Sequence, residues 1–110
     1  LVATKDHAVV HAVAFIRANL TEQISVDDIA DAAQCSRRTL ERRFREALDR
    51  TVHDELMRQR LARARRLLQE TEMPLEKLAK QTGFTDSRRL GLVFRKKFGT
   101  TPAAFRKSLH

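Results

Sequence analysis

The chain has 110 residues, a length that suits one compact domain or two very small units sharing a core. Its 22 Lys and Arg against 14 Asp and Glu give a formal net charge of +8 at pH 7, which favours a polyanionic partner. A hydrophobic fraction of 42% excludes a disordered chain, and the scarcity of glycine and proline favours helices over a fold of strands and turns.

The first segments predict two helices. Apolar residues recur at intervals of four, three and four near the start of the chain, at Val9, Val13, Ile16 and Leu20. This stripe predicts an amphipathic helix over 5–20, with Thr4 as the expected N-cap. Ser25, followed by two acids in the first turn, predicts a short helix that ends near Ala33.

A break at residues 34–36 precedes a basic helix. Ser36 is the expected N-cap, and the helix is predicted to run to about Leu48. Leu40 and Phe44 have the spacing of a buried stripe, so the arginines of this helix are expected to face outward. They fall within nine positions: Arg37, Arg38, Arg42, Arg43 and Arg45.

The longest predicted helix extends from Thr51 to about Glu70. Thr51 and Asp54 have the spacing of a capping box. The expected buried stripe of this helix comprises Met57, Leu61, Ala64 and Leu68. At about 1.5 Å per residue, such a helix spans roughly 30 Å, which is close to one turn of B-DNA.

Three further helices are predicted, over 73–81, 86–98 and 101–109. Asp86 or Thr85 is the expected N-cap of the middle one, and Gly99 ends it. The order of short helix, tight turn and basic helix therefore occurs twice in the chain.

The two occurrences form an internal repeat. Before the turn, residues match at an offset of 49: Val26 with Leu75, Ile29 with Leu78, Ala30 with Ala79 and Cys35 with Phe84. After one inserted residue they match at an offset of 50: Leu40 with Leu90, Phe44 with Phe94, Arg45 with Arg95, Leu48 with Phe98 and Thr51 with Thr101. We therefore predict an all-α fold with two helix-turn-helix subdomains, 1–50 and 72–110, joined by a linker helix over 51–71.

In a helix-turn-helix unit the second helix presents long side chains to base edges in the major groove. In the first copy, Arg38, Glu41 and Arg42 share one exposed face. Arginine binds guanine through O6 and N7, and glutamate accepts a hydrogen bond from cytosine N4. The equivalent positions of the second copy hold Ser87, Arg88, Gly91 and Leu92. The other basic residues of both helices are expected to contact phosphates: Arg37, Arg43, Arg45, Arg89, Arg95, Lys96 and Lys97.

Three strings carry a resemblance to a known family: residues 36–44 (SRRTLERRF), 60–68 (RLARARRLL) and 93–106 (VFRKKFGTTPAAFR). With them, the chain from about residue 7 resembles the DNA-binding domain of the AraC/XylS family of bacterial transcription regulators. Within that family, residues 53–58 (HDELMR) resemble the xylose operon regulators.

The resemblance implies sequence-specific binding of duplex DNA, with the helices over 36–48 and 86–98 in adjacent major grooves. It places the seven base-contact candidates against the bases. It also implies an effector-sensing domain before Leu1, in agreement with the absence of Met at that position, and a contact between the intact regulator and RNA polymerase. We expect no cofactor in this part of the regulator.

Some positions depart from the repeat. Gln34 and Asp49 occupy turns where the second copy has glycine, and a positive φ would strain Gln34 by about 1 kcal/mol and Asp49 by less. Val52 stands where the second copy has Pro102. Gly91 lies inside a predicted helix at a cost of roughly 0.5–1 kcal/mol relative to Ala. It either permits close approach to DNA or marks a weak base contact by the second copy.

Other functions remain as alternatives. The basic helical surface could dock an acidic protein partner, such as an autoinhibitory domain or RNA polymerase, or bind DNA without sequence preference. The sequence has no catalytic or phosphate-binding motif, so no enzyme is expected. Cys35 is interpreted as a buried apolar position, and His7 and His11 as surface residues rather than metal ligands. A single cysteine and the lack of an apolar run of membrane-spanning length favour a protein of the reducing cytoplasm.

Overall fold

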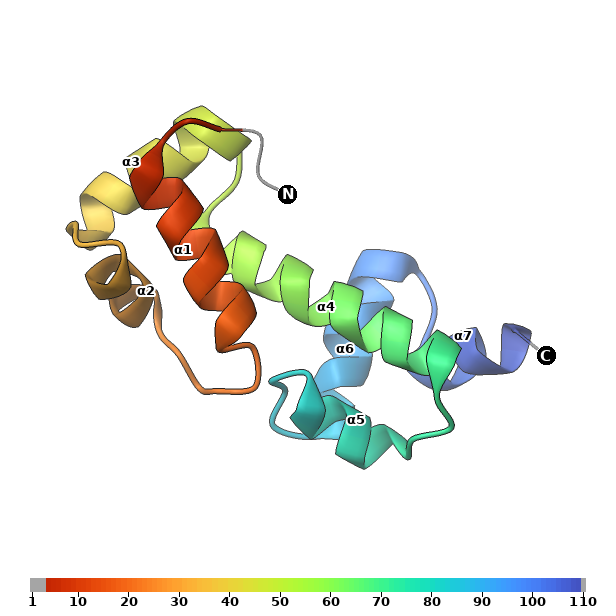
Figure 1. Ribbon diagram of the computed structural model, residues 1–110. Coiled ribbons are helices and arrows are strands. Elements are labelled where there is room, and N and C mark those ends of the chain that lie inside the picture. Colours follow the sequence, from red (N-terminus) through yellow and green to blue (C-terminus); the bar gives the residue numbers. More distant parts are fainter. Residues whose placement is uncertain (1–3, 110) are drawn as a thin grey trace. The chain divides into compact units, whose positions relative to one another are not determined.

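The structure, a computed structural model, describes residues 4–109 and is helical throughout, with no strand among those residues (Figure 1). The elements are α1 (His7–Ala18), α2 (Val26–Ala32), α3 (Arg37–Leu48), α4 (Val52–Glu70), α5 (Leu75–Gln81), α6 (Ser87–Phe98) and α7 (Pro102–Ser108). The predicted all-α fold with seven helices is therefore confirmed. None of the helices in the described residues is long and apolar enough to cross a membrane.

The chain divides into two compact units, which we call the first unit (residues 1–59) and the second unit (60–110). The boundary falls inside α4, so the start of this helix belongs to the first unit and its end to the second. Each unit contains one copy of the sequence repeat. The short helices α2 and α5 both have 7 residues, and the basic helices α3 and α6 both have 12, which confirms the repeat.

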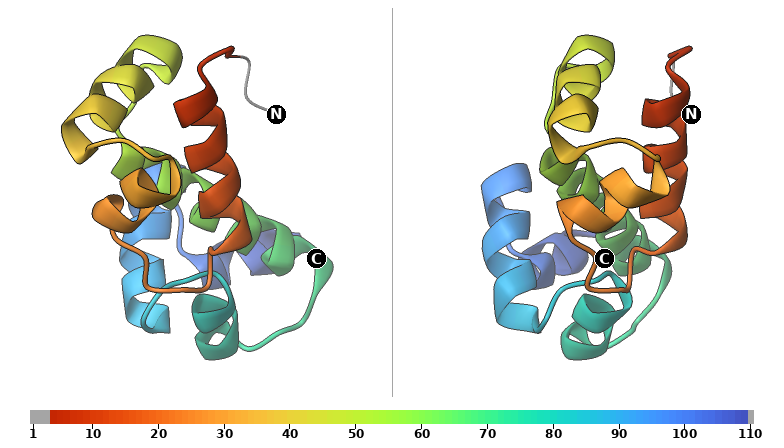
Figure 2. Two further views of the ribbon diagram at one scale, coloured as in Figure 1. Left: turned by 60° about the vertical axis from the view of Figure 1, so that its left-hand side comes forward. Right: turned by 90° about the vertical axis from the view of Figure 1, so that its left-hand side faces the viewer.

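In the first unit, α1 packs against both α2 and α3 (Figure 2). The predicted stripe on α1 is buried, and so are the inner residues of α2 and α3. Together with the start of α4 they form one apolar core, which includes Val9, Ile16, Ile29, Leu40, Phe44 and Val52. Cys35 is half-buried against this core, close to its predicted place as an apolar residue.

In the second unit, α6 packs against α5 and α7. Leu78, Leu90 and Phe94 are fully buried. The Phe94 ring centroid lies 4.6 Å from that of Phe98 and 5.7 Å from that of Phe105. These aromatic contacts join α6 to α7, so an apolar layer lies beneath the exposed face of α6.

Side-chain caps begin most of the helices. Ser25, Ser36, Asp86 and Thr101 each accept a hydrogen bond from a backbone N–H of the first turn. The predicted capping box of α4 is also present, because Asp54 N–H donates to Thr51 Oγ1 (3.0 Å) and Thr51 N–H to Asp54 Oδ2 (3.2 Å). These caps satisfy backbone donors that have no partner within the helix.

The prediction that Thr4 caps α1 is wrong. Asp6, not Thr4, caps this helix: its Oδ1 accepts hydrogen bonds from the N–H groups of Ala8 (3.0 Å) and Val9 (3.2 Å). Thr4 instead accepts from the N–H of Asp6 at 3.1 Å. Because α1 begins at His7, Thr4 lies too early in the chain to reach the first helical donors, whereas the Asp6 carboxylate also interacts favourably with the helix dipole.

The turns of the two units have the same geometry. Gln34 has φ 58° and Gly83 has φ 88°, so the turn requires the left-handed conformation that the repeat implied. Cys35 N–H donates to Ala30 O at 3.1 Å, and the equivalent Phe84 N–H donates to Ala79 O at 2.9 Å. The non-glycine residue of the first unit therefore adopts the same backbone conformation under strain.

Candidate nucleic-acid interface

The outer face of α3 is positioned by the core beneath it. Leu40 and Phe44 are fully buried, which leaves Arg38 and Arg42 exposed on the opposite side of the helix. Ser36 begins the helix, with its Oγ accepting from Thr39 N–H at 3.1 Å. The structure therefore places Arg38 and Arg42 in the N-terminal half of α3, one helical turn apart on the same face.

Most arginines of α3 have a carboxylate partner. The ion pairs are Arg37–Asp27 (4.0 Å), Arg42–Glu46 (3.7 Å), Arg43–Asp6 (3.6 Å) and Arg45–Asp49 (3.6 Å). The Arg38 side chain makes no hydrogen bond or ion pair within the described residues. Exposed ion pairs contribute little to stability, so a DNA phosphate can replace the carboxylate partners of these arginines. Among the described residues, Arg38 has no carboxylate partner to lose when it binds DNA.

Glu41 also lies near this face, and its carboxylate contacts the protein itself. Its Oε1 accepts a hydrogen bond of 2.9 Å from the backbone N–H of Val52, the first residue of α4. The side chain is half-buried. One of its two carboxylate oxygens is thus used to join α3 to the start of α4, a contact that sequence analysis did not foresee.

The second basic helix, α6, is held at its start by two carboxylates. Asp86 Oδ1 accepts from Arg89 N–H at 2.8 Å, and Glu76 Oε2 on α5 accepts from Ser87 N–H at 3.1 Å. Hydrogen bonds from the side chain and the backbone of Ser87 lower the pKa of Glu76. Helices α5 and α6 are therefore joined at the point where α6 begins.

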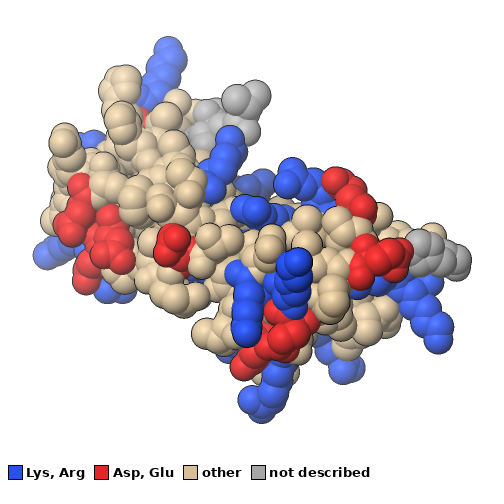
Figure 3. Space-filling model, turned by 60° about the horizontal axis from the view of Figure 1, so that its bottom comes forward, with Lys and Arg blue, Asp and Glu red and all other residues tan. Residues whose placement is uncertain are grey.

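The exposed face of α6 is cationic. It presents Arg88, Arg89, Arg95, Lys96 and Lys97. None of these five side chains forms an ion pair within the described residues, unlike most arginines of α3. On the face drawn in Figure 3, Lys and Arg side chains protrude into solvent at many places while acidic side chains gather in small groups. The charge of α6 is thus uncompensated and available to an anion.

Two apolar positions interrupt this cationic face. Leu92 is 57% exposed, although its neighbours Leu90 and Phe94 are fully buried. Gly91 precedes it, and a Cβ built there would meet no atom within 4 Å. The structure therefore brings together all four predicted base-contact candidates of the second copy at the N-terminal half of α6, with Ser87 half-buried and Arg88 exposed.

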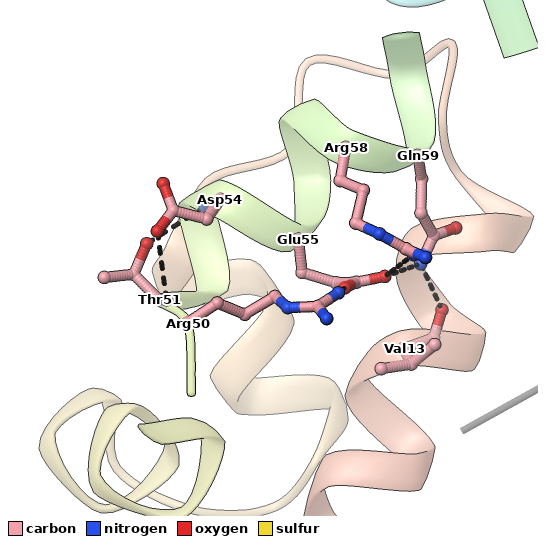
Figure 4. A network of polar contacts seen from close by, with 7 residues as sticks. All are labelled: Val13, Arg50, Thr51, Asp54, Glu55, Arg58 and Gln59. Atoms are coloured by element: carbon pink, nitrogen blue, oxygen red, sulfur yellow. Dashed lines mark hydrogen bonds and ion pairs between the residues drawn. The ribbon is translucent and has the colours of Figure 1, made fainter. Parts of the chain in front are cut away.

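A buried polar network lies at the start of α4, and sequence analysis missed it (Figure 4). Glu55 on α4 is 3% exposed, and its carboxylate binds Arg50 Nη1 (2.6 Å), Gln59 Nε2 (2.7 Å) and Arg58 Nη1 (3.7 Å). Gln59 Nε2 also donates to Val13 O on α1 at 3.5 Å. The only sequence signal was a carboxylate with Arg and Gln three and four residues later, on the inner side of a helix. Its role is to fasten the loop after α3 to α4.

The end of α4 contributes cations to the second unit. The guanidinium carbon of Arg65 lies 5.3 Å from the Phe98 ring centroid and 5.6 Å from that of Phe105. This cation–π arrangement occupies Arg65 within the protein. Arg60 is almost completely buried, and burial lowers its pKa, although a guanidinium remains charged at physiological pH.

In the part of the chain that the structure describes, no three side chains of His, Cys, Asp or Glu come together as metal ligands. His7 and His11 lie on the exposed side of α1, as predicted for surface residues.

The chain has relatives among known proteins. A family model described as a helix-turn-helix domain matches residues 29–108. The chain is 34% identical over 101 residues to the xylose operon regulatory protein of Escherichia coli strain K12, and this match covers 92% of the chain but only 26% of that protein.

Solved structures with the same fold are also similar in sequence. The DNA-binding domain of AdpA, a global transcriptional factor crystallised with a target DNA, is 33% identical with a TM-score of 0.88, covering 94% of this chain and 93% of that one. A transcriptional regulator with an AraC-type DNA-binding domain from Chromobacterium violaceum is 33% identical with a TM-score of 0.85, covering 93% and 91%.

Proposed function

The chain belongs to the AraC-type family of helix-turn-helix domains, which serve transcription regulators as DNA-binding output domains, and from this premise we propose how it binds. Helices α3 and α6 act as the two recognition helices and enter adjacent major-groove segments of one duplex, roughly 34 Å apart. The role is binding rather than catalysis. The observation that carries the proposal is the repeated unit, in which a short helix braces a basic helix with an exposed cationic face.

In the first unit, base recognition falls to Arg38 and Arg42. Both are exposed in the N-terminal half of α3, the part of a recognition helix that meets base edges. Each guanidinium can bind guanine O6 and N7 with two hydrogen bonds. Glu41 acts chiefly by holding α3 against α4, since its carboxylate accepts from Val52 N–H. We therefore expect the block bound by the first unit to be rich in guanine.

Phosphate contacts supply most of the affinity. The candidates are Arg37, Arg43 and Arg45 on α3 and Arg89, Arg95, Lys96 and Lys97 on α6. If six to eight phosphates are neutralised, the logarithm of the binding constant falls against the logarithm of salt concentration with a slope of about −5 to −7. The cations of α6 contribute most to this slope, because no carboxylate competes for them within the described residues.

The chain acts within a longer regulator. It spans about a quarter of the length of the xylose operon regulatory protein that it resembles. An effector-sensing domain and a contact with RNA polymerase, expected from the resemblance, belong to that intact regulator. Its location is the bacterial cytoplasm, where the operator DNA lies.

The test is selection of binding sites from a random duplex library at about 150 mM salt, followed by titration of the enriched site against scrambled DNA. We expect two short blocks about 10 base pairs apart. The enriched site should bind at least about 10³-fold more tightly than the scramble. Binding with a normal salt slope but no preference for any sequence would instead indicate a non-specific DNA-binding protein. No DNA binding at all would favour a module that docks an acidic protein.

A further inference from the structure

The exposed face of α6 has an apolar centre between cations. Leu92 is 57% exposed, and Arg88 and Lys96 lie one helical turn before and after it on the same face. At the equivalent position of the first unit stands Arg42. The two recognition helices therefore offer different chemistry at one position, a guanidinium in α3 and an isobutyl group in α6.

The glycine beside this leucine has no internal reason to be glycine. Its φ is not positive, since the positive-φ glycines are Gly83 and Gly99. A Cβ at Gly91 would meet open space, so Ala would fit and would stabilise a helix interior. The bare backbone at Gly91 therefore leaves open space for a surface that approaches from outside the protein.

The first unit shows why glycine is tolerated here. Its equivalent residue, Glu41, accepts a hydrogen bond from Val52 N–H. In the second unit Pro102 replaces Val52, and proline has no N–H to satisfy. The residue at position 91 therefore has no backbone N–H of α7 to cap, and it is available for contact with a ligand.

We propose that Gly91 and Leu92 form a shallow apolar contact for the 5-methyl group of thymine in the major groove. This inference rests on the proposed function and adds the base that the second unit selects. Thymine is the one base that presents a methyl group in that groove, where the others present donors and acceptors alone. Lys96, one helical turn after Leu92, holds a flanking phosphate, and the bare backbone at Gly91 lets the base edge approach.

The experiment uses the site selected by the whole chain. The block that loses preference in Arg38→Ala belongs to α3, so the other block belongs to α6. Each thymine of both blocks is then replaced singly by uracil, which removes only the methyl group, and binding is titrated for the wild type and Leu92→Ala. One thymine-to-uracil change in the α6 block is expected to weaken wild-type binding about fourfold. In Leu92→Ala the same change should have no effect.

Leu109→Ala is the matched control, because Leu109 is also an exposed leucine of the second unit, 43% exposed, but lies beyond α7. This variant should keep the full effect of uracil. A second variant, Gly91→Ala, should melt at a higher temperature than the wild type and yet bind the selected site more weakly.

Two results would overturn the proposal while leaving the proposed function intact. One is an α6 block in which no uracil substitution changes binding. The other is an equal effect of uracil in the wild type and in Leu92→Ala, which would assign the methyl contact to another residue. Failure to enrich any sequence would overturn the proposed function and this inference together.

Discussion

Oε1 of Glu41 on α3 lies 2.9 Å from the backbone nitrogen of Val52 and accepts a hydrogen bond from its N–H. The equivalent residues of the second unit are Gly91 and Pro102, which lack the carboxylate and the N–H respectively. The two differences between the halves of the repeat, Glu41 against Gly91 and Val52 against Pro102, are therefore linked, because each pair deals with the same backbone donor in its own way. A side-chain cap satisfies the first donor of α4, and a proline removes that donor from the start of α7.

This exchange predicts the behaviour of Glu41 variants. Glu41→Ala leaves the Val52 N–H without its partner and should lower the free energy of unfolding by about 1 kcal/mol. In a Val52→Pro background the same substitution should cost much less, because the donor is gone. Urea unfolding of the two single variants and the double variant measures this coupling. Equal costs in both backgrounds would contradict the cap.

Substitutions of Arg38, Lys96 and Glu41 should have different effects on the DNA sequence that the chain prefers. Arg38→Ala should relax preference at particular base pairs by about 1–3 kcal/mol, whereas Lys96→Ala should weaken binding to all sequences and reduce the salt slope by about 1. Glu41→Ala should leave the preferred sequence unchanged while it lowers stability. Site selection repeated with each variant is the measurement, and a changed preference in Glu41→Ala would restore its predicted role as a contact to cytosine.

The left-handed residues predict stabilising substitutions. Gln34 has φ 58° and Asp49 has φ 54°, so Gln34→Gly should raise the free energy of unfolding by about 1 kcal/mol and Asp49→Gly by less. Gly99→Ala provides the reverse control, because its φ is 76° and a Cβ there meets open space. Any loss of stability in that variant comes from backbone conformation alone. Thermal unfolding that shows no gain in Gln34→Gly would contradict the assigned strain.

Acid should weaken the start of α4. Hydrogen bonds from the backbone and the side chain of Thr51 lower the pKa of Asp54, with smaller contributions from His53 and Arg45. A lowered pKa in the folded state means that ionised Asp54 stabilises the fold above the unfolded pKa of about 3.9, and that this stabilisation disappears as the pH falls through the lower, folded value. The free energies of unfolding of the wild type and of Asp54→Asn, measured from pH 7 to pH 2, should therefore become equal at the acid end. A difference that is constant over this range would exclude the titration of Asp54 as its source.

Local patterns predicted most of the fold. The spacing of apolar residues gave all seven helices, and Ser25, Ser36 and Thr51 cap the helices that they were predicted to cap. Caps act over two or three residues, so the sequence itself contains both partners. The error at α1 arose because Thr4 and Asp6 are both good caps, and the choice depends on where the helix begins.

Contacts between side chains on different helices could not be predicted from the sequence. Glu41 and Val52 are 11 residues apart and meet only because the left-handed Asp49 returns the chain after α3. The same loop brings Arg50 to the buried carboxylate of Glu55. Which arginine has a carboxylate neighbour likewise depends on tertiary packing, as the pair of Arg43 with Asp6 illustrates. These contacts decide which candidate residues are available to DNA.

Because α7 begins with Pro102, which has no N–H to satisfy, the second unit can be redesigned for a new DNA specificity more easily than the first. A library that varies position 41 also removes the carboxylate that accepts from the Val52 N–H, so any new base preference gained there comes with a loss of stability. A library at Gly91 and Leu92 has no such coupling, because no described atom lies against Gly91 and Leu92 projects into solvent. The second unit is therefore the half in which new operator preferences can be engineered without repairing the scaffold.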